Sequence, residues 1–323
     1  MKQREELLDF IKGLAIISVI LIHNLKDPVL EDAYYWYYIG QAVPLFMLVS
    51  GYLGYKKYTQ SNQLLVSQRV FLKTLKSIFI PFVFITVLQL IGRLYLGTFN
   101  FESFIELGGM GPGSYYPWIF IQAIIIMPAI VYLSDRYAKT WQSASIIVGI
   151  SILLNVILTI LDIPKDLYRL LVVRYIVYLY LGCLWRKNGL RWSFTWVILI
   201  GLSALFAWLQ IYEHVNFTPL IFNSWRTYSW LTACYTVGLV LFIKFLYRLL
   251  KPYNVTSMIC FLGTHSYYIF LSQLLLFSLF KRSYLDFITI PVIKDMAYVL
   301  LTLMLSLAPL YVNWLRKKRE DLA

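Results

Sequence analysis

The sequence predicts an all-α fold, a polytopic integral membrane bundle of about ten transmembrane helices with both termini in the cytoplasm. Of its 323 residues, 60% are hydrophobic and only 14% are charged. The mean hydropathy is +0.68. Soluble domains have roughly 45–50% apolar and roughly 25% charged residues. Apolar runs of about twenty residues, the length that a helix needs to cross a bilayer, recur along the whole chain.

The apolar runs are separated by short polar or charged segments, and each run is an expected helix. They lie at about 7–25, 33–53, 74–97, 116–134, 141–161, 170–185, 193–212, 228–250, 256–280 and 291–315. Since we find no internal repeat and no soluble appendage, residues 1–323 are expected to form a single membrane domain.

Loop charges predict the orientation, because Lys and Arg accumulate in cytoplasmic loops. With the N-terminus inside, the inner segments hold 18 Lys and Arg residues and the outer loops hold 6. This bias predicts that both termini are cytoplasmic. The net charge of +13 then follows from topology and from contact with anionic lipid headgroups, so no nucleic-acid partner is expected.

The three cysteines carry no sign of a metal site or a disulfide framework. Cys183, Cys234 and Cys260 are odd in number and all fall within predicted spans. Their spacing matches no metal-ligand motif. We expect them to pack in the core, and we expect no bound metal.

The first run, "LLDFIKGLAIISVILIHN" at 7–24, contains Asp9, Lys12 and His23. A charge at bilayer depth costs roughly 2.5–3.5 kcal/mol, so such groups are usually kept for a function. On a helix Lys12 and His23 lie within about 20° of one face and about 16 Å apart in depth. Asp9 lies one turn below Lys12. This pattern predicts a functional polar stripe that joins the two membrane sides. The alternative is a self-satisfied Asp9–Lys12 pair, with Lys12 snorkelling to the interface and His23 interfacial.

Other polar residues also predict a polar interior. Arg93 and Arg174 fall in the outer halves of the third and sixth spans, where a polar or anionic ligand would be a natural partner. Snorkelling to the interface is the alternative. Ser50 would present a hydroxyl to a cavity, and Pro44 and Gly51 would let the second span bend or pack closely. The outer segment 98–115 ends in a Gly/Pro cluster, which predicts a lip over an external opening.

Five motifs occur in order along nearly the whole chain. They are "REELLDFIKGLAIISVILIH", "VPLFMLVSGYLGYKK", the basic run from Arg69 to Lys76 before "IFIPF", "YYPWIFIQAIIIMP" and "FLGTHSYYIFLSQ". Together they resemble the membrane-bound acyltransferase-3 family. Two positions depart from the family pattern. Lys12 stands where many members have Arg, which keeps the charge but loses the bidentate fork. Gln273 stands where the closing motif often ends in His.

The resemblance implies an enzyme that moves an acyl group, acetyl being expected, from cytoplasmic acyl-CoA to a hydroxyl of an extracytoplasmic glycan. It implies a multi-pass protein of a bacterial plasma membrane. Acetyl-CoA would be a substrate, and no permanently bound cofactor is expected. The partners would be acyl-CoA, the glycan and membrane lipids, with the oligomeric state left open.

The resemblance also assigns expected roles to residues. His23 would be a general base or a transient acyl carrier, with Lys12 and Asp9 completing the catalytic stripe. Basic side chains would bind the phosphates of the acyl donor, namely Arg69, Lys73, Lys76, Lys56 and Lys57. The acceptor side of the cavity would be formed by Ser50, Arg93, Arg174 and Trp118.

Two other functions have the same gross features. A transporter or flippase for a glycan or lipid-linked sugar also needs many spans and buried charges. It would commonly show an inverted repeat, which we do not find in the sequence. A binding or sensing module is usually fused to a catalytic domain. Acyl-CoA dependence separates the acyltransferase from both.

Overall fold

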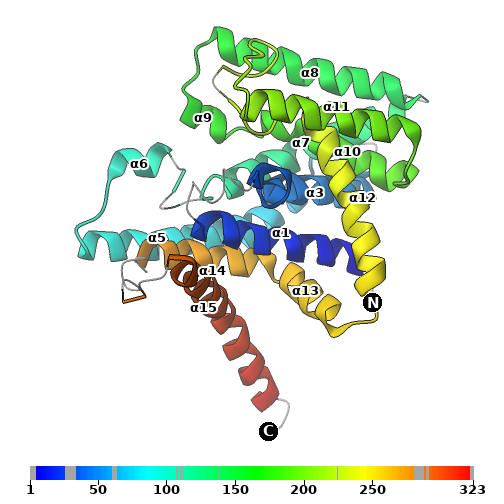
Figure 1. The fold of residues 1–323 in the computed structure, drawn as a ribbon. Helices are drawn as coiled ribbons and strands as arrows, with labels where there is room; N and C mark the ends of the chain where they lie inside the picture. Colours follow the sequence, from blue (N-terminus) through cyan, green and yellow to red (C-terminus); the bar gives the residue numbers. More distant parts are fainter. Residues whose placement is uncertain are drawn as a thin grey trace.

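The computed structural model describes residues 5–25, 34–59, 64–106, 108–109, 111, 113–137, 139–223, 225–279, 287–288 and 291–320. Within these ranges all regular secondary structure is helical, as the sequence predicts (Figure 1).

Helices occupy all ten predicted ranges. The long ones are α1 (Glu6–Asn24), α3 (Ala42–Tyr58), α4 (Gln68–Thr74) continuing through η3 (Leu75–Phe79) into α5 (Ile80–Tyr95), α7 (Tyr116–Arg136), α8 (Thr140–Ile160), α10 (Ile176–Asn188), α11 (Phe194–Ile211), α12 (Ala233–Leu250), α13 (Asn254–Thr264), α14 (Ser266–Leu279) and α15 (Pro291–Glu320). Short helical turns are η1 (Tyr35–Tyr37), η2 (Ile39–Gln41), α6 (Phe101–Glu106), α9 (Lys165–Arg169) and η4 (Val172–Tyr175).

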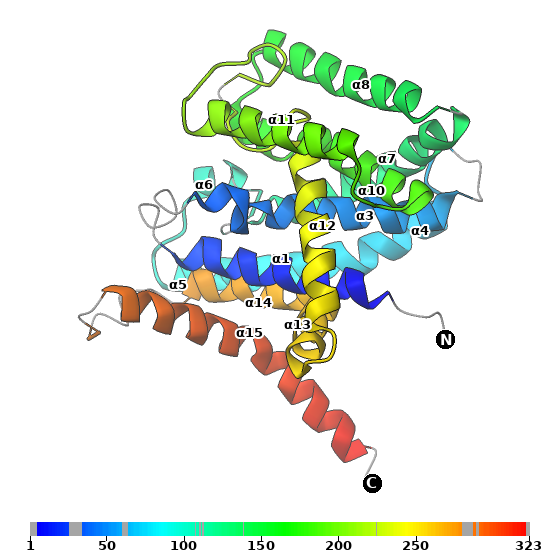
Figure 2. The same ribbon diagram turned by 45° about the vertical axis from the view of Figure 1, so that its right-hand side comes forward.

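The ninth predicted range, 256–280, is not one straight helix. It divides into α13 and α14, which meet at His265 with a bend of 69°. Gly263 explains the close packing of α13 on α1, because a Cβ there would overlap the carbonyl of Asp9. The bend then directs α14 along another line beside α1 (Figure 2).

Five helical units in the described part of the chain are long and apolar enough to cross a membrane. They are Gln68–Tyr95, Tyr116–Arg136, Thr140–Ile160, Phe194–Ile211 and Ala233–Leu250. The bent pair α13 and α14 becomes a sixth when it is counted as one span. Ten crossings therefore stay a prediction from the sequence.

Helix α1 lies in the middle of the bundle, against α3, α13 and α14 (Figures 1 and 2). The closest packing joins α3 to α10, where Gly51 and Gly182 allow backbone contact. A Cβ on Gly51 would overlap the Leu179 carbonyl, and one on Gly182 would overlap that of Leu48. The predicted close packing at Gly51 is thus observed. Pro44 lies in the first turn of α3, where it disrupts no helical hydrogen bond.

Side chains from several helix ends meet at one end of the bundle. Glu5 forms ion pairs with Lys56 at 2.7 Å and with Arg186 at 3.5 Å. Tyr247 donates a hydrogen bond to Glu6 at 2.8 Å. Loop charges predict all these ends to be cytoplasmic, so we refer to this end as the inner end. The opposite end of α1, with His23, is the outer end.

Candidate functional site

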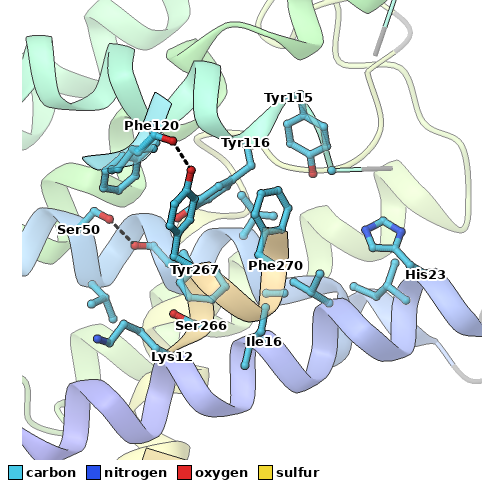
Figure 3. A pocket seen from close by; sticks show the side chains of 18 of the residues that line it. Lys12, Ile16, His23, Ser50, Tyr115, Tyr116, Phe120, Ser266, Tyr267 and Phe270 are labelled. Atoms are coloured by element: carbon cyan, nitrogen blue, oxygen red, sulfur yellow. Dashed lines mark hydrogen bonds between the residues drawn. The ribbon is translucent and has the colours of Figure 1, made fainter. Parts of the chain in front are cut away.

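A cavity of about 320 Å³ extends along α1 between Lys12 and His23. Its walls come from α1, α3, α7, α14 and the residues just before α7 (Figure 3). Most of the lining is apolar or aromatic, with a few polar groups that include Lys12, His23, Ser50 and Ser266. The volume lies at the lower end of the range for small-molecule sites, about 300–1,000 Å³.

One face of α1 forms a wall of this cavity. Lys12, Ile16, Val19 and His23 all line it, at spacings of four, three and four residues. Residues at these spacings lie on one side of a helix. The structure therefore brings Lys12 and His23 to the same cavity, as their spacing predicts. Figure 3 shows them at its two ends.

Asp9 does not line the cavity but binds a residue that does. Its carboxylate lies 2.7 Å from the Lys12 ammonium, in an i, i+3 ion pair. Asp9 is buried, with 5% of its surface exposed. The side chain of Lys12 is 22% exposed. The self-satisfied pair that the sequence offered as an alternative therefore exists, but Lys12 also faces the cavity.

The space before the His23 imidazole depends on a glycine. Gly113 lines the cavity and has φ of +89°, a conformation that favours glycine. A Cβ there would lie 3.7 Å from Nε2 of His23 and 3.1 Å from the ring of Phe270. Gly113, which belongs to the segment predicted as a lip, thus leaves room next to the imidazole. Its nearness to His23 could not be read from the sequence.

The closing motif supplies three lining residues that sequence reasoning did not single out, namely Ser266, Tyr267 and Phe270. Ser266 and Tyr267 begin α14, directly after the bend, and both line the cavity. The Tyr267 hydroxyl donates to the Ile78 carbonyl. His265 is not a lining residue, and its Nδ1 lies 2.9 Å from the Phe261 carbonyl oxygen.

The four predicted acceptor-side residues differ in their positions. Ser50 lines the cavity, with its hydroxyl donating to the Phe46 carbonyl at 2.7 Å. Arg174 is 3% exposed and lies behind the lining residue Tyr115, 5.1 Å from its ring centroid. Arg93 and Trp118 are not lining residues. Arg93 is half-buried, and Trp118 is exposed and donates its indole N–H to a backbone carbonyl.

A second arginine lies next to the outer end of the cavity. The guanidinium of Arg169 is 4.9 Å from the Tyr115 ring centroid. It is also near enough to His23 for the two groups to interact electrostatically. Sequence reasoning counted Arg169 only as an outer-loop charge. No local signal marked it, because a spacing of five residues to Arg174 matches neither the helical nor the strand period.

The predicted donor-binding cations lie at the inner end but do not form one group. Arg69, Lys73 and Lys76 are exposed, and Lys57 is close enough to Lys73 for their charges to interact. Lys56 instead pairs with Glu5. Burial opposes ionisation of the Glu5 carboxyl, but hydrogen bonds from Lys56 and Tyr52 hold its pKa below the ordinary value.

The site offers acid–base chemistry in a cavity with mostly apolar walls. An imidazole at one end can accept a proton from a hydroxyl, and the apolar walls limit the access of water. In the described part of the chain no three His, Cys, Asp or Glu side chains lie close enough together to hold a metal ion.

Comparison with known proteins gives one match. Residues 6–312, nearly the whole chain, match the acyltransferase-3 family model, whose description is "Acyltransferase domain". No curated protein and no solved structure matches the chain.

Proposed function

Because the chain belongs to the acyltransferase-3 family of membrane acyltransferases, we propose that it moves an acyl group, with acetyl expected, from cytoplasmic acyl-CoA to a hydroxyl of an extracytoplasmic glycan. The observation that carries this proposal is the single cavity that extends from Lys12 to His23. Such a transfer requires a passage that joins a donor on one side of the membrane to an acceptor on the other.

His23 is the proposed general base. The acceptor hydroxyl gives its proton to the imidazole while its oxygen forms a bond to the thioester carbonyl carbon. The carbon–sulfur bond then breaks, and the proton passes to the departing coenzyme A thiolate. A general base contributes a factor of about 10² to 10⁴. Gly113 supports the role, because its missing side chain leaves room beside Nε2.

The inner end of the cavity is the proposed entry for the acyl donor. Leu53 and Ile78 line this part of the cavity. Lys57 follows Leu53 by one helical turn, and Lys76 precedes Ile78 by two residues. Cationic side chains at this position suit the phosphates of coenzyme A. Lys12 would then position the donor within the cavity, held by Asp9.

Purified protein in liposomes, supplied with radiolabelled acetyl-CoA and a glycan acceptor, tests the proposal. His23→Ala should lower acyl transfer at least about 10²-fold at equal amounts of inserted protein. The matched control is His214→Asn, a remote histidine hydrogen-bonded to Arg226. An active His23→Ala protein would exclude His23 as the base. Glycan movement without acetyl-CoA consumption would instead favour a flippase.

A further inference from the structure

Two arginines flank one aromatic residue at the outer end of the cavity. Arg169, the last residue of α9, and Arg174, in η4, place their guanidinium groups 4.9 and 5.1 Å from the ring centroid of Tyr115. Tyr115 itself lines the cavity. Arg174 also donates from Nη2 to the carbonyl of Arg169 at 2.8 Å, which ties the two residues together.

Neither guanidinium forms an ion pair with a carboxylate in the part of the chain that the structure describes. Arg174 is only 3% exposed, and its Nε has no hydrogen-bond partner there. Its other neighbours are the rings of Tyr175 and Trp225, at 4.8 and 4.5 Å. Contacts with aromatic rings stabilise a buried guanidinium less than an ion pair with a carboxylate would. The outer end of the cavity is thus electropositive.

This positive charge lies next to the proposed reaction centre. Arg169 is half-buried, so a ligand can reach it, and it interacts electrostatically with His23. Arg174 lies behind Tyr115 and acts through its field and through its hydrogen bond to Arg169. An acceptor whose hydroxyl is at His23 therefore lies in the same cavity as Tyr115, whose ring contacts the Arg169 guanidinium. Planar guanidinium groups bind carboxylates and phosphates through paired hydrogen bonds.

We propose that the acceptor is an acidic glycan whose carboxylate or phosphate binds Arg169 next to His23. Arg174 is a positioning residue that holds Arg169 through its backbone carbonyl and adds positive charge behind Tyr115. This inference rests on the proposed function, since it names the substrate class of the same site.

Sugar binding tests the inference without any acyl transfer. Saturation-transfer NMR on the detergent-solubilised protein would compare methyl glucuronide and glucose 6-phosphate with neutral methyl glucoside. Both anionic sugars should bind at least about tenfold more tightly than the neutral one, because charge-assisted hydrogen bonds are the stronger ones. Their relative affinities distinguish a carboxylate from a phosphate acceptor.

Variants test whether Arg169 causes the preference for anionic over neutral sugars. Arg169→Gln should reduce the anionic preference about tenfold, and Arg169→Lys should keep part of it because the charge remains. The control is Arg226→Gln, an arginine that lines a different pocket and is hydrogen-bonded to His214 at 2.8 Å. Equal binding of charged and neutral sugars, or an unchanged preference in Arg169→Gln, would overturn the inference.

The acetyl-CoA assay keeps the two proposals separate. Transfer of acetyl to neutral and anionic acceptors with equal efficiency would leave the proposed function standing and overturn the acidic acceptor. Anionic sugars that bind through Arg169, in a protein that never consumes acetyl-CoA, would support the anion site and refute the acyltransferase mechanism.

Discussion

The Asp9–Lys12 pair provides the sharpest test of whether Lys12 has a function or only satisfies a buried acid. Lys12→Met removes the ammonium that lies 2.7 Å from a carboxylate with 5% exposure. Removing one partner of a buried pair costs about 3–5 kcal/mol. Because Lys12 is 22% exposed and water screens part of the interaction, we expect the lower end of this range or less.

The double variant Asp9→Asn/Lys12→Met removes both charges and should recover most of that stability, because the buried negative charge of Asp9 is removed together with its ammonium partner. If Lys12 positions the acyl donor, the double variant should be stable but still impaired, with a raised KM for acetyl-CoA. Lys12→Arg should keep both stability and transfer, since the charge is retained. Thermal unfolding in detergent and steady-state acetyl transfer, normalised to inserted protein, measure the two effects separately.

A double variant that regained stability and full activity together would refute a functional role for Lys12. The pair would then be purely structural, and the donor would have to be positioned by other groups at the inner end. A single Lys12→Met variant with wild-type stability would contradict the energetic argument itself.

Three further predictions test other parts of the molecule. Gly113→Ala adds a Cβ 3.7 Å from His23 Nε2 at a φ of +89°, so acetyl transfer should fall about tenfold or more while acetyl-CoA binding stays unchanged. The control is Gly149→Ala, whose added Cβ would lie in open space, and normal transfer by Gly113→Ala would contradict the proposed site. Replacing Arg69, Lys73 and Lys76 by Gln should weaken acetyl-CoA binding about tenfold, since exposed contacts are each worth about 0–1 kcal/mol. The control is the same change at Arg191, Lys244 and Arg248, and equal weakening of acetyl-CoA binding by both sets would reveal a nonspecific charge effect. A reporter fused at Asp162, between α8 and α9, should be extracytoplasmic, and a cytoplasmic signal would reverse the predicted orientation.

The positions of the helices follow from the sequence because apolar runs of membrane length are a strong local signal. The bend at His265 does not follow from it, since both halves of 256–280 are apolar and hydropathy is insensitive to a change of direction. Helix α3 begins at Ala42 instead of residue 33, because residues 35–37 and 39–41 form the short turns η1 and η2. There Trp36 is buried with 1% exposure.

Some residues of the candidate site could be predicted from local sequence, whereas others depend on tertiary packing. Lys12 and His23 could be placed on one face because both lie on one helix with a known period. Gly113 and Arg169 could not be placed, since Gly113 reaches the cavity, and Arg169 reaches the lining residue Tyr115, from segments whose paths depend on packing between helices. Gly113 lies directly before α7, and the two arginines lie in the short helical turns α9 and η4 before α10. The helix that carries the proposed base therefore meets the proposed acceptor-binding groups only after the bundle has assembled. Variants in those loops should consequently alter acceptor choice more than acyl-CoA use.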